Sequence, residues 1–178
     1  MESPINLFKP SYRIDECLKE IEICLSKGWT GLGFKTVEFE EKWKEYTGFE
    51  NAYFINSSTS GLFMSLELFK ANYKWKNDSE IITTPITFIS TNHAILNACL
   101  VPRFADVDNS LNLSPESVRA NINKKTKAVM FVGIGGNTDN YIEIKKICTQ
   151  HGLILILDAA HMAGSKINNR QVGLDADA

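Results

Sequence analysis

Apolar residues in the first 50 positions recur at helical spacing. One helix is predicted over residues 12–27, where apolar side chains share one face and a glycine follows as a stop signal. A glycine-rich turn over residues 28–33 separates it from a second predicted helix over 36–47. The apolar face of the first helix carries Cys17 and Cys24, so these thiols are expected to be buried.

Beyond residue 50 the pattern changes to short apolar runs that alternate with helical periodicity. Strands are predicted over residues 52–55, 80–84, 101–107, 128–132 and 153–157. Helices are predicted after the polar turn at 56–60, over 88–98, from a Ser114 cap followed by Pro115, and over 139–151. Apolar strands that alternate with helices predict an α/β fold, a mostly parallel sheet with helices on both faces. Such sheets bind ligands at the carboxyl ends of their strands.

Several of these strand ends carry residues that suit a ligand. The turn over residues 56–61 places hydroxyl groups at a helix start, where free backbone N–H groups and the helix dipole favour phosphate. Phe88, just past a strand, could face a planar ligand, and Asp158, directly after five apolar residues, needs a partner. Taken singly, these features are also typical of a helix cap, a core aromatic and a capping carboxylate. Together they match pyridoxal phosphate (PLP), whose ring accepts electrons while a carboxylate keeps its nitrogen protonated.

Short motifs spread along the whole chain point the same way. They are the glycine-rich segment 28–33, Glu38-Phe39-Glu40 with Tyr46-Thr47-Gly48, the turn from Asn56 to Leu62, Glu80-Ile81-Ile82 with Pro85-Ile86-Thr87-Phe88, Pro102 to Asp108, and Asp158-Ala159-Ala160-His161. In combination they resemble the DegT/DnrJ/EryC1/StrS family of PLP-dependent sugar aminotransferases, from about residue 5 to the last residue. The resemblance implies the large domain of the aspartate-aminotransferase type fold (fold type I), here truncated. Residues 1–35 would form an N-terminal helix with the glycine-rich segment, and residues 36–178 part of the PLP-binding large domain.

The resemblance also implies where the cofactor binds. The expected cofactor-binding residues are Ser58, Thr59 and Ser60 at the phosphate, Phe88 on the ring face, Asp158 at the ring nitrogen and His161 near the 3′ oxygen. The lysine that holds the cofactor covalently in the family falls beyond residue 178, so no catalytic residue is expected in this chain. Lys166 matches a variable position of the family, and Gly133 to Gly136 replaces its His-Leu-Tyr-Gly pattern.

An amino-group transfer to a sugar is the activity that the resemblance implies. The intact enzyme would move an amino group from an amino acid, usually glutamate in this family, to a keto-sugar attached to a nucleotide. Sugar dehydratases of the same family are the alternative, and members are typically homodimers. The chain without its lysine is expected to bind PLP weakly and without transaminase turnover.

Other interpretations remain open. The segment from Gly133 to Thr138 follows a predicted strand and precedes a predicted helix, which gives an NAD-binding Rossmann-like domain as a weak alternative. The chain could also be a catalytically inactive remnant or a partner-binding fragment. A sheet without its neighbouring strands would expose an apolar edge, which predicts poor solubility or self-association.

The composition narrows the remaining classes of function. Apolar residues make up 44% and charged residues 22%, with a formal net charge of −2, which is ordinary for a soluble globular protein. Lys and Arg are not clustered on one predicted face, so nucleic acid is not expected as a partner. No apolar run approaches the roughly 20 residues that span a membrane, and the N-terminus has no signal core, so a cytoplasmic setting is expected. No closely spaced cysteine pair predicts a metal site.

Overall fold

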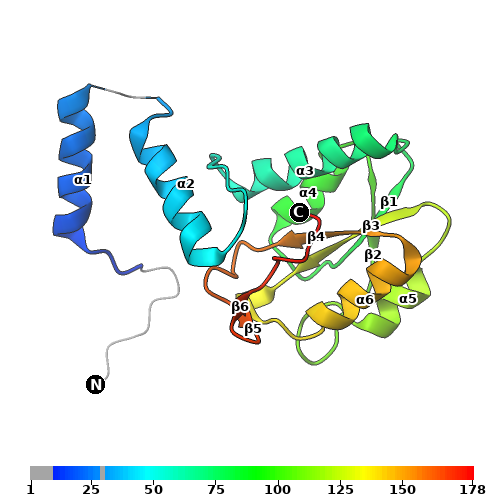
Figure 1. Ribbon diagram of the computed structural model, residues 1–178. Helices are drawn as coiled ribbons and strands as arrows, with labels where there is room; N and C mark the ends of the chain where they lie inside the picture. Colours follow the sequence, from blue (N-terminus) through cyan, green and yellow to red (C-terminus); the bar gives the residue numbers. More distant parts are fainter. Residues whose placement is uncertain (1–9, 29–30) are drawn as a thin grey trace, which may run out of the picture.

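A parallel four-stranded sheet forms the centre of the molecule (Figure 1). The computed structural model describes residues 10–28 and 31–178, so positions 29 and 30 of the predicted glycine-rich turn lie outside the described residues. The strands are β1 (Glu80–Thr83), β2 (Val101–Phe104), β3 (Thr126–Val132) and β4 (Ile154–Asp158). They lie in the order β2-β1-β3-β4, and every neighbouring pair is parallel. The predicted α/β fold with a parallel sheet is confirmed.

Two pairs of helices cover the two faces of this sheet (Figure 1). They are α3 (Ser58–Tyr73) with α4 (Ile89–Asn97), and α5 (Pro115–Asn121) with α6 (Tyr141–His151). Successive strand residues enter different cores: Ile81 packs in the cluster with residues of α3 and α4, whereas Ile82 packs with those of α5 and α6. Since side chains alternate between the faces of a strand, a sheet covered on both sides needs the continuous apolar runs that the sequence contains.

Serine side chains cap two of the covering helices, α3 and α5. The hydroxyl of Ser57 accepts a hydrogen bond from the backbone N–H of Ser60, and Ser57 is the N-cap of α3. Ser114 caps α5 in the same way through the N–H of Ser117, with Pro115 at the first helical position. These caps satisfy backbone donors that have no partner within the helix, which confirms the predicted start at Ser114.

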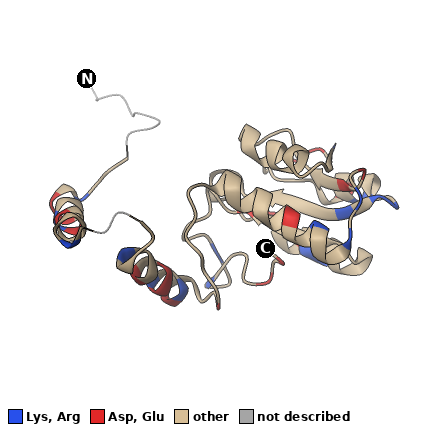
Figure 2. Ribbon diagram, turned by 90° about the horizontal axis from the view of Figure 1, so that it is seen from above, with Lys and Arg blue, Asp and Glu red and all other residues tan. Residues whose placement is uncertain are grey.

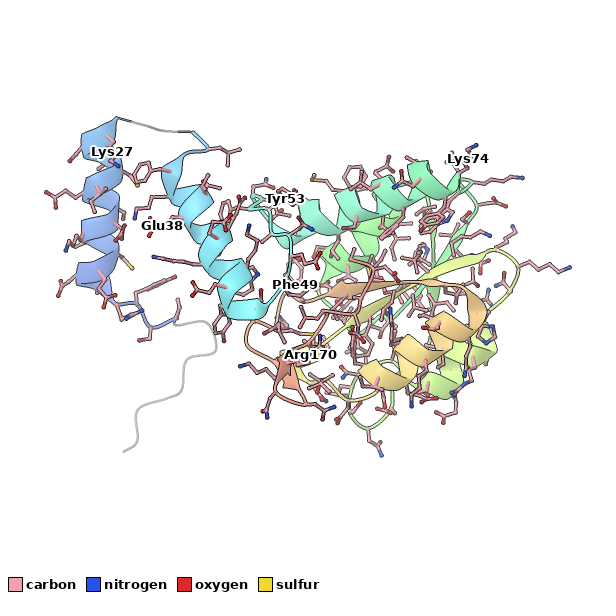
Figure 3. All side chains as sticks on the ribbon, viewed as in Figure 1. Lys27, Glu38, Phe49, Tyr53, Lys74 and Arg170 are labelled. Carbon is pink, nitrogen blue, oxygen red and sulfur yellow. The ribbon has the colours of Figure 1, made fainter. Side chains whose placement is uncertain are left out.

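The helices α1 (Ile14–Lys27) and α2 (Phe34–Thr47) lie to one side of the sheet and its helices (Figure 1). No residue of α1 is buried, and Cys17 is exposed, so the prediction that its thiol is buried was wrong. Cys24 is only half-buried. The ammonium of Lys27 lies 3.8 Å from the ring centroid of Phe34 on α2 (Lys27 is labelled in Figure 3). The predicted division between residues 35 and 36 stays a prediction.

The segment between α2 and α3 is not a strand, which corrects the prediction for residues 52–55. It is extended but pairs with no described strand. Tyr53, labelled in Figure 3, is 80% exposed, and the backbone N–H of Phe54 donates to a carboxylate oxygen of Glu40 at 2.6 Å. An apolar run becomes a strand only where a neighbouring edge supplies backbone partners. Among the described residues, the carboxylate of Glu40 on α2 accepts the backbone hydrogen bond of Phe54 that a neighbouring strand would otherwise accept.

Smaller departures concern short elements. The strand predicted over 101–107 ends at Phe104, and a 3-10 turn η1 (Ile134–Gly136) follows β3. A short antiparallel hairpin of β5 (Lys166–Ile167) and β6 (Arg170–Gln171) was not predicted. Two-residue strands have too little periodicity to be seen in a sequence.

The outer edge of β4 is partly covered by the last residues of the chain. The backbone N–H of Leu157 donates to the carbonyl of Ala178 at 2.8 Å, and that of Asp177 donates to Leu155 at 2.9 Å. In Figure 2, Lys and Arg positions gather toward the right-hand end of the sheet layer. The ammonium of Lys125 pairs with the carboxylate of Asp78 at 3.0 Å. Among the described helices, none is both long and apolar enough to cross a membrane.

Candidate cofactor-binding site

A hollow of about 540 Å³ lies at the carboxyl ends of β1, β3 and β4. It is lined by Ser58, Thr59, Thr87, Phe88, Ser90, Val132, Ile134, Asp158, Ala160 and His161. Five of the six residues expected at the cofactor therefore share one hollow, although they are spread between positions 58 and 161 of the sequence. The carboxyl-end edge is where parallel sheets bind ligands.

The start of α3 supplies backbone donors to this hollow. Ser57 is the cap, and its carbonyl accepts the first helical bond from Gly61, so the N–H groups of Ser58 and Thr59 have no acceptor within the helix. Both residues line the hollow. Ser60 is not among the lining residues, and its hydroxyl lies 3.1 Å from the hydroxyl of Ser57. Free N–H groups at the positive end of a helix form an anion site.

Phe88 presents an open aromatic ring. It is the N-cap residue of α4, with β-region dihedral angles, and it is 74% exposed. A core phenylalanine would be fully enclosed, as Phe131 on β3 is. The core interpretation of Phe88 is therefore wrong, and its ring is accessible from the hollow that it lines.

Asp158 is a buried carboxylate at the end of β4, only 5% exposed. Its Oδ2 accepts a hydrogen bond from the hydroxyl of Thr91 at 2.7 Å, and its Oδ1 accepts one from the backbone N–H of Ala160 at 3.2 Å. Turns follow Asp158, so it caps no helix. Thr91 was not predicted as a site residue, because its only signal in the sequence is a hydroxyl three residues after the aromatic.

His161 is held by the loop that follows β3. The backbone N–H of Gly135 donates to Nδ1 of His161 at 3.2 Å. An accepting Nδ1 carries no proton, so the neutral imidazole has its proton on Nε2, and that nitrogen is the donor left for a ligand. A Cβ at Gly133 would collide with Sδ of Met162, and Gly135 has φ +61°. Glycine at these two positions lets the loop approach the turn that carries His161.

The same loop argues against a dinucleotide fingerprint. A phosphate-binding glycine turn opens directly into its helix, so that the helix N-terminus meets the phosphate. Here η1 intervenes, Asn140 caps α6 with φ +68°, and α6 begins only at Tyr141. The glycines serve the contact with His161 instead.

Comparison with known proteins identifies the family. The profile of the DegT/DnrJ/EryC1/StrS aminotransferase family matches residues 12–178. The chain belongs to this family. The spore coat polysaccharide biosynthesis protein SpsC of Bacillus subtilis (strain 168) is 35% identical over 164 residues, which cover 92% of this chain and 41% of SpsC. The predicted family membership is confirmed.

Solved structures of the family confirm the fold. Helicobacter pylori PseC, an aminotransferase involved in the biosynthesis of pseudoaminic acid, matches with a TM-score of 0.80 and 30% identity, over 93% of this chain and 43% of PseC. E. coli GDP-4-keto-6-deoxy-D-mannose-3-dehydratase with bound hydrated PLP matches with a TM-score of 0.79 and 26% identity, over 86% of this chain and 40% of the dehydratase. The chain thus spans less than half the length of these relatives.

The groups around the hollow fit the cofactor of the family. An exposed ring, a buried carboxylate and free backbone donors at a helix start correspond to the flat ring, the ring nitrogen and the phosphate of PLP. No lysine is among the lining residues of the described hollow, and Lys166 lies exposed on β5.

Proposed function

We propose that the whole protein is a PLP-dependent aminotransferase that transfers an amino group to a nucleotide-linked keto-sugar. The observation that carries this proposal is the convergence of Thr59, Phe88, Asp158 and His161 on one hollow of a chain that belongs to the aminotransferase family. Glutamate is the proposed amino donor. A homodimer is the proposed assembly of the complete protein.

Each lining group has a role that its chemistry supports. The N–H groups of Ser58 and Thr59 bind the cofactor phosphate, and Ser60 strengthens the helix start through Ser57. The ring of Phe88 stacks on the face of the pyridine ring. These contacts hold the cofactor at its phosphate end and on one face of its ring.

The polar side chains set the protonation and orientation of the cofactor. When bound, PLP supplies an electron sink for the carbon that loses its proton. Asp158 keeps a proton on the ring nitrogen through the attraction between its carboxylate and the protonated ring, and water screens this attraction little because Asp158 is buried. His161 donates from Nε2 to the 3′ oxygen, since Gly135 occupies Nδ1.

A sugar dehydratase is the second candidate. The similarity to E. coli GDP-4-keto-6-deoxy-D-mannose-3-dehydratase, with bound hydrated PLP, supports it. The two activities differ in the fate of nitrogen, because an aminotransferase leaves the donor nitrogen on the sugar and a dehydratase does not.

Isotope transfer tests the proposal. The complete protein is incubated with PLP, ¹⁵N-glutamate and a nucleotide-linked 4-keto-6-deoxy sugar, and the sugar product is analysed by mass spectrometry. We expect ¹⁵N in the sugar and an equal amount of 2-oxoglutarate. Asp158→Ala should abolish the transfer, whereas Lys166→Ala, outside the hollow, should retain it. A dehydrated sugar without ¹⁵N would establish the dehydratase, and no conversion of any keto-sugar would overturn both candidates.

A further inference from the structure

A buried hydroxyl group orients the Asp158 carboxylate. Thr91 has no exposed surface, and its Oγ1 donates to Oδ2 of Asp158 at 2.7 Å. The other carboxylate oxygen is held by the backbone N–H of Ala160 at 3.2 Å. Because a buried carboxylate depends on donors for its stability, these two bonds fix the plane of the carboxylate. Only one of them comes from a side chain.

A second hydrogen bond connects Thr91 to Thr87, which lines the hollow. A hydroxyl has a single proton, and Thr91 gives its proton to Asp158, which as a carboxylate can only accept. The oxygen of Thr91 is therefore the acceptor for the hydroxyl of Thr87, which lies 2.7 Å away. Thr87 itself lines the hollow. A chain of donors thus runs from Thr87 through Thr91 to Asp158, and each bond in such a chain strengthens the next.

The first turn of α4 places both the aromatic ring and this donor. Phe88 is the N-cap of α4, and the backbone N–H of Thr91 donates to the carbonyl of Phe88 at 3.2 Å. A threonine in a helix has few rotamers, and the two hydrogen bonds of the Thr91 hydroxyl select one of them. One helical turn therefore couples the ring of Phe88 to the orientation of Asp158.

We propose that Thr91 is a positioning residue of the cofactor site, supported by Thr87. It holds the carboxylate of Asp158 in the orientation that binds the ring nitrogen of PLP, and it touches neither substrate nor cofactor itself. This role rests on the proposed function.

The first test measures the affinity for PLP by titration in absorbance, without any assay of turnover. Thr91→Val keeps the shape but removes the donor, and we expect it to weaken PLP binding roughly tenfold, as for a lost hydrogen bond to a charged group. Thr91→Ser should restore an affinity close to that of the wild type. Thr83→Val is the matched control, because the hydroxyl of Thr83 is equally buried but donates to the neutral Asn92 at 3.2 Å.

The second test is a double-mutant cycle on the protein without PLP. Thr91→Val should lower the urea midpoint in the wild type and lower it less in the Asp158→Asn background, because the charged acceptor is gone. If the wild type binds PLP and Thr91→Val binds equally tightly, or Thr83→Val binds as weakly, the positioning role is overturned while the proposed function stands. If the wild type binds no PLP, the proposed function is overturned, and the cycle alone decides whether Thr91 orients Asp158.

Discussion

Replacing Phe88 with alanine distinguishes a ligand-facing ring from a core ring. Phe88 is 74% exposed, so about a quarter of its surface, roughly 50 Å², is buried in the fold. At about 25 cal/mol/Å², this area corresponds to only ~1 kcal/mol of stability. A phenylalanine that belonged to the core would instead cost about 3–5 kcal/mol on truncation.

Phe131 provides the matched substitution. It is fully buried on β3, and its ring packs edge-on against Tyr141 with the ring centroids 5.7 Å apart. Phe131→Ala should therefore lower the free energy of unfolding by about 3–5 kcal/mol, and Phe88→Ala by about 1 kcal/mol or less, in urea unfolding followed by circular dichroism. The two variants remove the same atoms, so the difference reflects how tightly each ring is packed in the fold.

The affinity for PLP should be lowered by Phe88→Ala, the variant that loses little stability. Stacking on an aromatic face contributes about 0.5–1.5 kcal/mol beyond the buried area, so Phe88→Ala should weaken PLP binding roughly tenfold. The binding is measured on folded protein by absorbance titration. The reasoning fails if Phe88→Ala loses as much stability as Phe131→Ala, or if it binds PLP as tightly as the wild type.

Further predictions concern other groups of the described chain. His161→Gln should keep most of the PLP affinity and His161→Ala should lose roughly 3- to 10-fold, since only the glutamine retains an N–H donor; equal losses in titration would contradict this. Burial raises the pKa of the Cys148 thiol to about 12, so iodoacetamide at pH 8 should alkylate exposed Cys17 in the native protein and Cys148 only after unfolding, as read by peptide mass spectrometry. The hydroxyl of Ser110 is the main cause that lowers the pKa of Asp108 in the folded state. The ionised Asp108 carboxylate therefore stabilises the folded state fully above the unfolded pKa of about 3.9, and this stabilisation is lost as the pH falls through the lower folded pKa. The difference in Tm between wild type and Asp108→Ala should accordingly shrink below about pH 4.

The sequence predicted the sheet and its covering helices because their signals are local. The five apolar residues before Asp158 leave no polar face, which is typical of a strand buried on both sides, and Ser114 with Pro115 marks a helix start by residue type alone. The apolar run at residues 52–55 has the same appearance, yet it forms no strand. Strand formation depends on a neighbouring edge, and the residues of the run itself contain no information about that edge.

The same distinction explains what the sequence could indicate about the site. The exposed ring of Phe88 and the buried carboxylate of Asp158 could be expected, because a residue just after a parallel strand lies at the ligand-binding edge wherever that strand stands in the sheet. Thr91 could not, because its bond to Asp158 joins residues that are 67 positions apart and depends on how α4 crosses the end of β4. A threonine in the first turn of a helix has an ordinary role as a local hydrogen-bond donor, and nothing in its sequence neighbourhood separates that role from a contact with a distant carboxylate. Residues that touch the ligand can therefore be found from strand ends, whereas residues that orient them require the packing of the whole sheet.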